Sequence, residues 1–179
     1  MRRIVIFFFW LIACIAVPRE ESPLIVAARS GDAAAVQRLA KAGSDPNAPW
    51  GEYGWTPLMH AIHKNQLASV GALLDAGADP NRAEPGAMTP LMMAAGYGQT
   101  ETVRLLMRRG ADPKVADHHG ETALDYALAG EADIDDFTFF RCQDATVRAL
   151  IAAGAPPRAS TWALRSAKFK RCESASLVR

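Results

Sequence analysis

Histidine and aspartate are the side chains here with the chemistry to bind metals or move protons. His60 and His63 are three residues apart, the spacing of neighbours on one helix face, and imidazole is a common metal ligand. Asp117, His118 and His119 form a second group, and we interpret it as the polar tip of a loop. Two histidines do not make a metal site, and no nucleophile elbow, phosphate-binding glycine loop or HExxH motif is present. We therefore expect no enzymatic activity, no metal and no cofactor.

A second unusual stretch places acidic residues directly before aromatic ones. Its spacing does not match a calcium-binding loop. It is either a solvated loop whose rings fold back onto the domain, or an interaction loop that combines steering charges with aromatic anchors. The residues are Glu131, Asp133, Asp135, Asp136, Phe137, Phe139 and Phe140.

Length and composition allow one elongated domain with a targeting segment. The chain has 179 residues, of which 50% are hydrophobic, and a formal net charge of +1. A nearly neutral chain gives no electrostatic reason to expect nucleic-acid binding. The charge is unevenly spread, because residues 158–179 hold six basic residues and one acidic residue. This segment is either a solvated helix face or a patch for an anionic surface.

The N-terminal residues 1–17 have the layout of a secretory signal peptide. Arg2 and Arg3 precede an apolar run of 14 residues from Ile4 to Val17, and Pro18 follows it. As a helix the run would reach about 21 Å, short of the roughly 30 Å hydrocarbon core of a membrane. We expect export, with an uncleaved anchor as the weaker alternative.

Four residues within this run, Leu11, Ile12, Ala13 and Cys14, resemble the lipobox of bacterial lipoproteins. The resemblance implies that Cys14 is diacylated and becomes the mature N-terminus. More than one acyl chain is needed for stable anchoring, since each buried methylene contributes about 0.8 kcal/mol. Cleavage after Ala16, which releases a soluble protein, is the alternative. Either outcome locates the domain in the periplasm or at the periplasmic face of the outer membrane.

Cys142 and Cys172 are the remaining cysteines if Cys14 is lipidated. In an oxidising compartment these two can form a disulfide. Each could equally be a small buried apolar residue, and the sequence leaves both interpretations open.

The rest of the chain repeats with a period of 33 or 34 residues, counted from Ser22, Thr56, Thr89 and Thr122. Five positions agree in all four copies, which indicates internal repeats. They are Leu24, Leu58, Leu91 and Leu124; Ala27, Ala61, Ala94 and Ala127; Val36, Val70, Val103 and Val147; Leu39, Leu73, Leu106 and Leu150; and Gly43, Gly77, Gly110 and Gly154.

The recurring residues predict two helices in each copy. Threonine before Pro57 or Pro90 favours a helix start, because its hydroxyl caps free N–H groups and proline has none to satisfy. Gly31, Asn65 and Gly98 favour a helix end, because they tolerate positive φ. Valine and leucine three residues apart predict the buried face of a second helix. The Asp-Pro run after the second helix predicts a turn.

Thr-Pro-Leu and the Gly-Ala-Asp-Pro-Asn run at 77–81 resemble the most specific marks of the ankyrin-repeat family. The resemblance implies an all-α solenoid of four helix–turn–helix repeats, with β-hairpin fingers and a C-terminal capping helix. Each unit of such a stack contacts only its neighbours. The expected boundaries are 1–17 for the signal, 22–157 for the repeats (22–55, 56–88, 89–121 and 122–157) and 158–179 for the cap.

Two features depart from the family pattern. The family places a histidine after Thr-Pro-Leu, where it ties neighbouring hairpins together, but this chain has Ile25, Met59, Met92 and Asp125 there. We therefore expect weak hydrogen bonding between repeats and a stack that relies on packing. The fourth copy is 11 residues longer than the others, and the insertion falls near 130–143.

The resemblance implies a concave face that binds a protein, and the first finger carries aromatic side chains suited to it. Trp55 either packs the hairpin or joins them. Exposed tryptophan and tyrosine are typical binding anchors. The predicted partner-binding residues are Trp50, Glu52, Tyr53, Met59, Glu84, Met92 and His118.

The leading hypothesis is a non-catalytic, monomeric protein-binding module in the bacterial envelope, such as an inhibitor, immunity or stress-protection protein. Its protein partner is not identified by the sequence, and nucleic acid is not expected. The alternative is a structural envelope lipoprotein whose basic C-terminus contacts anionic membrane or cell wall.

Overall fold

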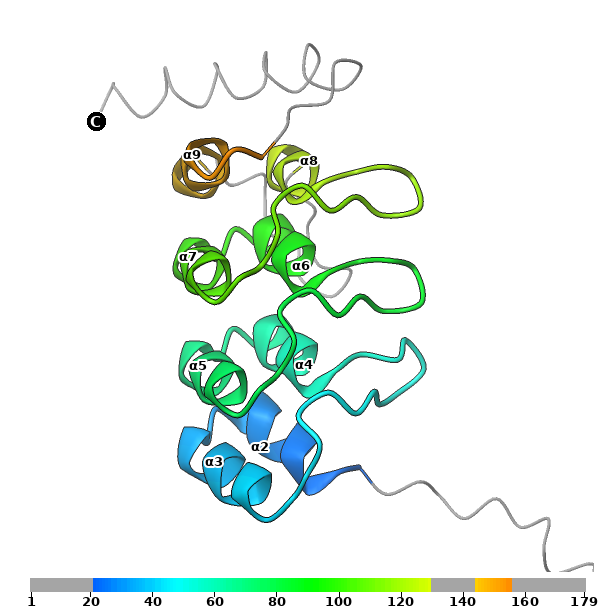
Figure 1. The fold of residues 1–179 in the computed structure, drawn as a ribbon, viewed down its shortest axis with the longest axis vertical. Coiled ribbons are helices and arrows are strands. Elements are labelled where there is room, and N and C mark those ends of the chain that lie inside the picture. The colour runs from blue at the N-terminus through cyan, green and yellow to red at the C-terminus, as the bar shows by residue number, and fades with distance from the viewer. Residues whose placement is uncertain (1–20, 130–143, 156–179) are drawn as a thin grey trace, which may run out of the picture.

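The computed structural model describes residues 21–129 and 144–155, and the regular elements of these residues are all helices, as predicted. Figure 1 shows the helices stacked in pairs that form two layers, with α2, α4, α6 and α8 in one layer and α3, α5, α7 and α9 in the other. Helices within a layer pack against the next pair along the stack. Their bounds are α2 Pro23–Ser30, α3 Ala33–Lys41, α4 Pro57–His63, α5 Leu67–Asp75, α6 Pro90–Gly96, α7 Thr100–Arg108, α8 Ala123–Ala129 and α9 Asp144–Ala152.

The predicted helix starts at the Thr-Pro pairs are confirmed. Thr56 Oγ1 accepts a hydrogen bond from the backbone N–H of Met59 at 3.3 Å, and Thr89 Oγ1 accepts one from Met92 at 3.2 Å. Proline is the first residue of both α4 and α6, where its missing N–H leaves no donor unsatisfied.

The predicted ends of the first helix in each pair are confirmed as well. Gly31, Asn65 and Gly98 have φ values of 83°, 55° and 67°. The chain therefore reverses at each of these residues through left-handed backbone, which glycine and asparagine adopt most easily.

The core consists largely of the recurring apolar positions. The leucines and alanines of the first-helix layer and the valines of the second-helix layer are buried, and they form one continuous cluster along the stack. Leu39 is an exception because it is only partly buried. It lies on α3, which belongs to the first helix pair that the structure describes and has a neighbouring pair on one side only.

The fingers that connect the pairs project beyond the first-helix layer (Figure 1). Among the described residues we find two isolated bridges, Trp50 with Trp55 and Ala116 with Thr122, and no β-strand. In the first finger Gly51 and Gly54 have positive φ, which lets the chain reverse between Trp50 and Trp55. The β-hairpin geometry that the resemblance implied is therefore not confirmed.

Asparagine side chains in the outer turns join neighbouring repeats, and this corrects the expectation of weak hydrogen bonding between them. Asn47 Nδ2 donates to the carbonyl of Gly77 at 3.1 Å, and Asn47 Oδ1 accepts from the N–H of Asp79 at 2.8 Å. Asn81 makes the same pair of bonds one repeat later, to Gly110 at 2.9 Å and from Asp112 at 2.8 Å. These asparagine bonds, in the turn after the second helix, thus partly replace the hydrogen bonds between repeats that the missing histidine would make.

Several predicted segments lie outside the described residues: the signal at 1–17, the insertion near 130–143 and the cap at 158–179. Within the part of the chain that the structure describes, every helix is too short or too polar to cross a bilayer.

Replacing Asn81 with alanine is expected to lower the free energy of unfolding by about 1–2 kcal/mol, because two hydrogen bonds between repeats are lost. Lys114 occupies the same position in the next turn and is a matched control, since only its backbone N–H bonds locally, to Asp112. Lys114→Ala should change stability by less than about 0.5 kcal/mol. Urea titrations followed by circular dichroism measure both variants, and equal effects would contradict the assigned role.

Candidate functional site

The first finger folds so that its aromatic residues face helix α4. The backbone N–H of Trp50 donates to the carbonyl of Trp55 at 2.8 Å, and the N–H of Gly54 donates to that of Gly51 at 3.2 Å. These bonds close a tight turn and bring the aromatic side chains of residues 50–55 close to the start of α4.

A chain of ring contacts runs from the tip of this finger along α4. The ring centroids of Tyr53 and Trp55 are 5.5 Å apart, those of Trp55 and His60 are 5.5 Å apart, and those of Trp55 and His63 are 5.1 Å apart. Such separations are typical of favourable aromatic pairs. Trp55 is therefore the central ring of the cluster and holds the finger against the helix.

The aromatic chain continues into the next repeat through Tyr97. The Tyr97 hydroxyl is 2.9 Å from His63 Nδ1, and the two ring centroids are 5.8 Å apart. Nearby, Gln99 Nε2 donates to the carbonyl of Ile62 at 2.7 Å, so the end of α4 is tied to the third helix pair twice. The site is therefore supported by the third helix pair.

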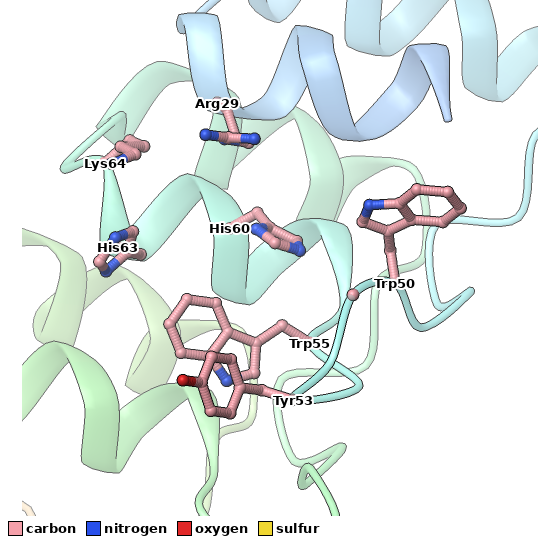
Figure 2. Close-up of a pocket in the computed structure, with 8 residues that line it drawn as sticks. Arg29, Trp50, Tyr53, Trp55, His60, His63 and Lys64 are labelled. Carbon is pink, nitrogen blue, oxygen red and sulfur yellow. The ribbon is translucent and has the colours of Figure 1, made fainter. Parts of the chain in front are cut away.

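These side chains surround a groove of about 200 Å³ at the junction of α2, α4 and the first finger. Figure 2 shows Arg29 and Lys64 beyond the two histidines, on the side away from Tyr53 and Trp55. The groove thus combines an aromatic wall with a cationic end. Its lining residues are Arg29, Trp50, Gly51, Tyr53, Trp55, His60, His63 and Lys64.

His60 is the half-buried polar residue in the middle of the groove. Burial lowers its pKa from the usual 6.5, the positive charge of Arg29 lowers it further, and His63 adds to the effect. The main chain of Trp50 and the charge of Glu21 act in the opposite direction but do not compensate. Its Nε2 is buried without a hydrogen-bond partner among the described residues. Burial and the neighbouring positive charge therefore disfavour protonation of His60.

The predicted partner-binding residues divide between three fingers. Trp50 and Tyr53 line the groove, and Tyr53 is 62% exposed. Glu52 is exposed on the same turn. Glu84, on the second finger, accepts a hydrogen bond from the N–H of Met88 at 3.2 Å, and His118 is exposed on the third. The structure therefore brings Trp50 and Tyr53 together at the groove and leaves Glu84 and His118 on separate fingers.

Met59 and Met92 do not belong to a binding surface, and their prediction was wrong. Their side chains are 0% and 1% exposed. Both follow Thr-Pro-Leu, where the side chain turns into the core between successive pairs, and Met92 Sδ accepts a hydrogen bond from the N–H of Thr89 at 3.4 Å. They stabilise the stack and are not available to a partner.

Sequence reasoning missed five residues of the groove: Arg29, Gly51, His60, His63 and Lys64. A signal was present, since His60 and His63 share a helix face, but it was considered only as a metal pair and rejected as one. The structure gives this pair a different setting, a ring cluster with Trp55. Within residues 21–129 and 144–155, no three His, Cys, Asp or Glu side chains converge on a point where they could hold a metal ion.

Asp117 stabilises the turn of the third finger, and its side chain is buried rather than exposed to a partner. Its carboxylate accepts hydrogen bonds of 2.8 Å from the N–H groups of His119 and Glu121 and from the Tyr126 hydroxyl. Burial alone would raise the pKa of Asp117, but these hydrogen bonds outweigh it and lower the pKa. Asp117 thus orders the turn that presents His118.

The three cysteines lie outside the described residues. The predicted lipidation of Cys14 and the disulfide between Cys142 and Cys172 therefore stay predictions.

The free energy of unfolding is expected to fall as the pH is lowered below about 6.5, because the unfolded chain protonates His60 there while the folded chain resists protonation. His60→Gln should flatten the dependence between pH 7.5 and 5.5. His118→Gln, at an exposed histidine, should leave it unchanged. Unfolding midpoints in urea across this range measure the effect, and a wild-type profile that is flat would refute the assignment.

Two family models match the chain. One is described as ankyrin repeats in three copies and matches residues 7–84, and the other as ankyrin repeats in many copies and matches residues 73–127. None of the curated proteins matches the chain. The two matches together cover more than half of the sequence and include every helix from α2 to α7. With its paired helices, Thr-Pro-Leu starts and projecting fingers, the chain belongs to the ankyrin-repeat family.

Proposed function

We propose that this chain is a non-catalytic protein-binding module and that its partner binds at the groove beside the first finger. Ankyrin repeats generally mediate protein–protein interaction, and they are typically not catalytic. The observation that carries the assignment of the site is Tyr53, a large side chain that is 62% exposed next to Trp55, in a groove that Trp50 also lines. Tyrosine, tryptophan and arginine dominate the binding energy of protein interfaces.

The size of the groove favours a protein over a small molecule. Pockets that enclose drug-sized ligands usually measure about 300–1,000 Å³. The groove measures about 200 Å³, which is room for a single side chain of a partner. The rest of that partner would lie across the fingers, which project along the same side of the stack (Figure 1).

The finer assignments rest on the sequence. We propose four repeats, with an export signal at 1–17 and lipidation at Cys14. These features favour a location in the periplasm or at the periplasmic face of the outer membrane, and a role as an inhibitor, immunity or stress-protection protein. The basic segment 158–179 favours the alternative of a structural lipoprotein that contacts anionic membrane or cell wall. Salt-sensitive vesicle binding that is lost on neutralising Lys168, Lys170 and Arg171 would support that alternative.

Site-specific photocrosslinking tests the proposed site directly. With p-benzoylphenylalanine in place of Tyr53, cells that naturally make the protein should yield one discrete adduct. Leu67 on α5 is a matched control, because it is 42% exposed but lies in the other helix layer. The adduct should disappear when Trp50→Ala is added, since an aromatic wall of the groove is lost. Absence of any adduct at position 53, or equal adducts at 53 and 67, would contradict the proposal.

Intact mass and fractionation of the full chain, expressed in a Gram-negative host, test the envelope assignment. The expected product is membrane-bound, begins at Cys14 and carries added acyl mass. Cys14→Ser should abolish both the acyl mass and the processing. A soluble product that begins near Val17 would instead establish soluble export, and an intact N-terminus would establish an uncleaved anchor.

A further inference from the structure

We propose that the groove recognises an acidic segment of the partner protein, with a carboxylate at the Arg29–Lys64 end and a neighbouring apolar side chain against the finger aromatics. The inference rests on the proposed function, because it specifies the chemistry of the partner at the same site. Two independent properties of the groove support it, its charge and its shape.

The charged residues that line the groove are all basic. Arg29 on α2 and Lys64 at the end of α4 are both exposed, and no lining residue is acidic. A segment that carries aspartate or glutamate is therefore complementary to this end of the groove, whereas a basic segment is repelled.

The structure already contains one carboxylate at this end. Glu21 Oε1 lies 2.7 Å from a terminal nitrogen of Arg29, and both side chains are partly exposed. An exposed pair of this kind contributes little to stability, about 0–1 kcal/mol. Because guanidinium presents five donors, Arg29 can bind a partner carboxylate beside Glu21 or in its place. Glu21 is then a mild competitor of the partner.

The opposite wall accepts an apolar side chain. Tyr53 and Trp55 line it (Figure 2), and the backbone of the finger is open, since a Cβ added to Gly51 would meet no atom within 4 Å. At about 30 Å³ per water molecule, the volume of about 200 Å³ corresponds to roughly seven waters or one large side chain. The groove thus fits an apolar residue next to an acidic one.

The pKa of His60, which lies between the cationic end and the aromatic wall, can report whether a carboxylate is bound. Burial lowers its pKa most, and the charges of Arg29, Glu21 and His63 also act on it, so a charge added beside it changes how readily it is protonated. A carboxylate bound at Arg29 adds negative charge and should raise the pKa of His60. An uncharged ligand in the same groove would not have this effect.

The experiment uses the full chain and two blocked peptides that differ only in charge. One has the sequence Gly-Ser-Asp-Phe-Glu-Leu-Asp-Ser-Gly, and the other has Asn and Gln in place of Asp and Glu. Calorimetry in 50 mM salt measures affinity, and NMR of the histidine ring protons measures the pKa of His60. The acidic peptide is expected to bind at least tenfold more tightly, to lose affinity in 500 mM salt and to raise the pKa of His60.

Charge variants assign the effect to the groove. Arg29→Gln combined with Lys64→Gln should weaken binding of the acidic peptide about fivefold or more. Glu21→Gln should strengthen it, because the competing carboxylate is removed. Arg38→Gln is the matched control, an exposed arginine on α3 outside the groove, and should leave the affinity unchanged. Circular dichroism of each variant verifies that it is folded.

Three outcomes would overturn the inference. The first is equal affinity for the two peptides, including binding of neither at 1 mM, and the second is an equal loss of affinity in Arg38→Gln. The third is the same shift in the pKa of His60 with inorganic phosphate alone, which would show simple anion binding. If Tyr53 still crosslinks to a partner in any of these cases, the proposed function stands and only the acidic chemistry is wrong. If the crosslink is also absent, both proposals fail.

Discussion

The burial of apolar side chains between successive helix pairs is the interaction on which every other feature depends. A single pair of helices seven to nine residues long cannot bury enough apolar surface to be stable in water. Leu58, Leu91 and Leu124 are fully or almost fully buried only because another pair packs against each of them. The fingers have no strand ladder of their own in the described residues, so the stack positions them.

This dependence explains how the groove is built. Arg29 and His63 occupy the same place in two successive copies, seven residues after Ser22 and Thr56 respectively. Stacking α2 on α4 therefore brings them to the same side of the layer. Lys64, the residue directly after α4, corresponds to Tyr97 in the third copy. Residues 34 apart in sequence thus become neighbours, as the 2.9 Å contact between His63 and Tyr97 shows.

Features that depend on residues close together in the sequence were predicted correctly. Features that depend on contacts between successive copies were not. The helices, the Thr56 and Thr89 caps and the positive φ of Asn65 follow from local residue preferences and were predicted. Whether Met59 points inward or outward depends on how the next pair packs, which no local pattern encodes. The bonds of Asn81 to the following turn likewise depend on a distance across the stack.

The residues that depart from the repeat are those that gather at the groove. Val26 and Met93 occupy the place of His60 in the neighbouring copies, so the fold does not require a histidine there. Placing a buried Nε2 without a hydrogen-bond partner costs roughly 1–3 kcal/mol, which packing alone does not explain. In the third copy Gly96 takes the place of His63, and Tyr126 lies 3.6 Å from where its Cβ would be, so packing fills that position instead. Polar, aromatic and cationic side chains are thus concentrated at positions that the repeat itself does not dictate, which is where functional sites are expected to depart from a pattern.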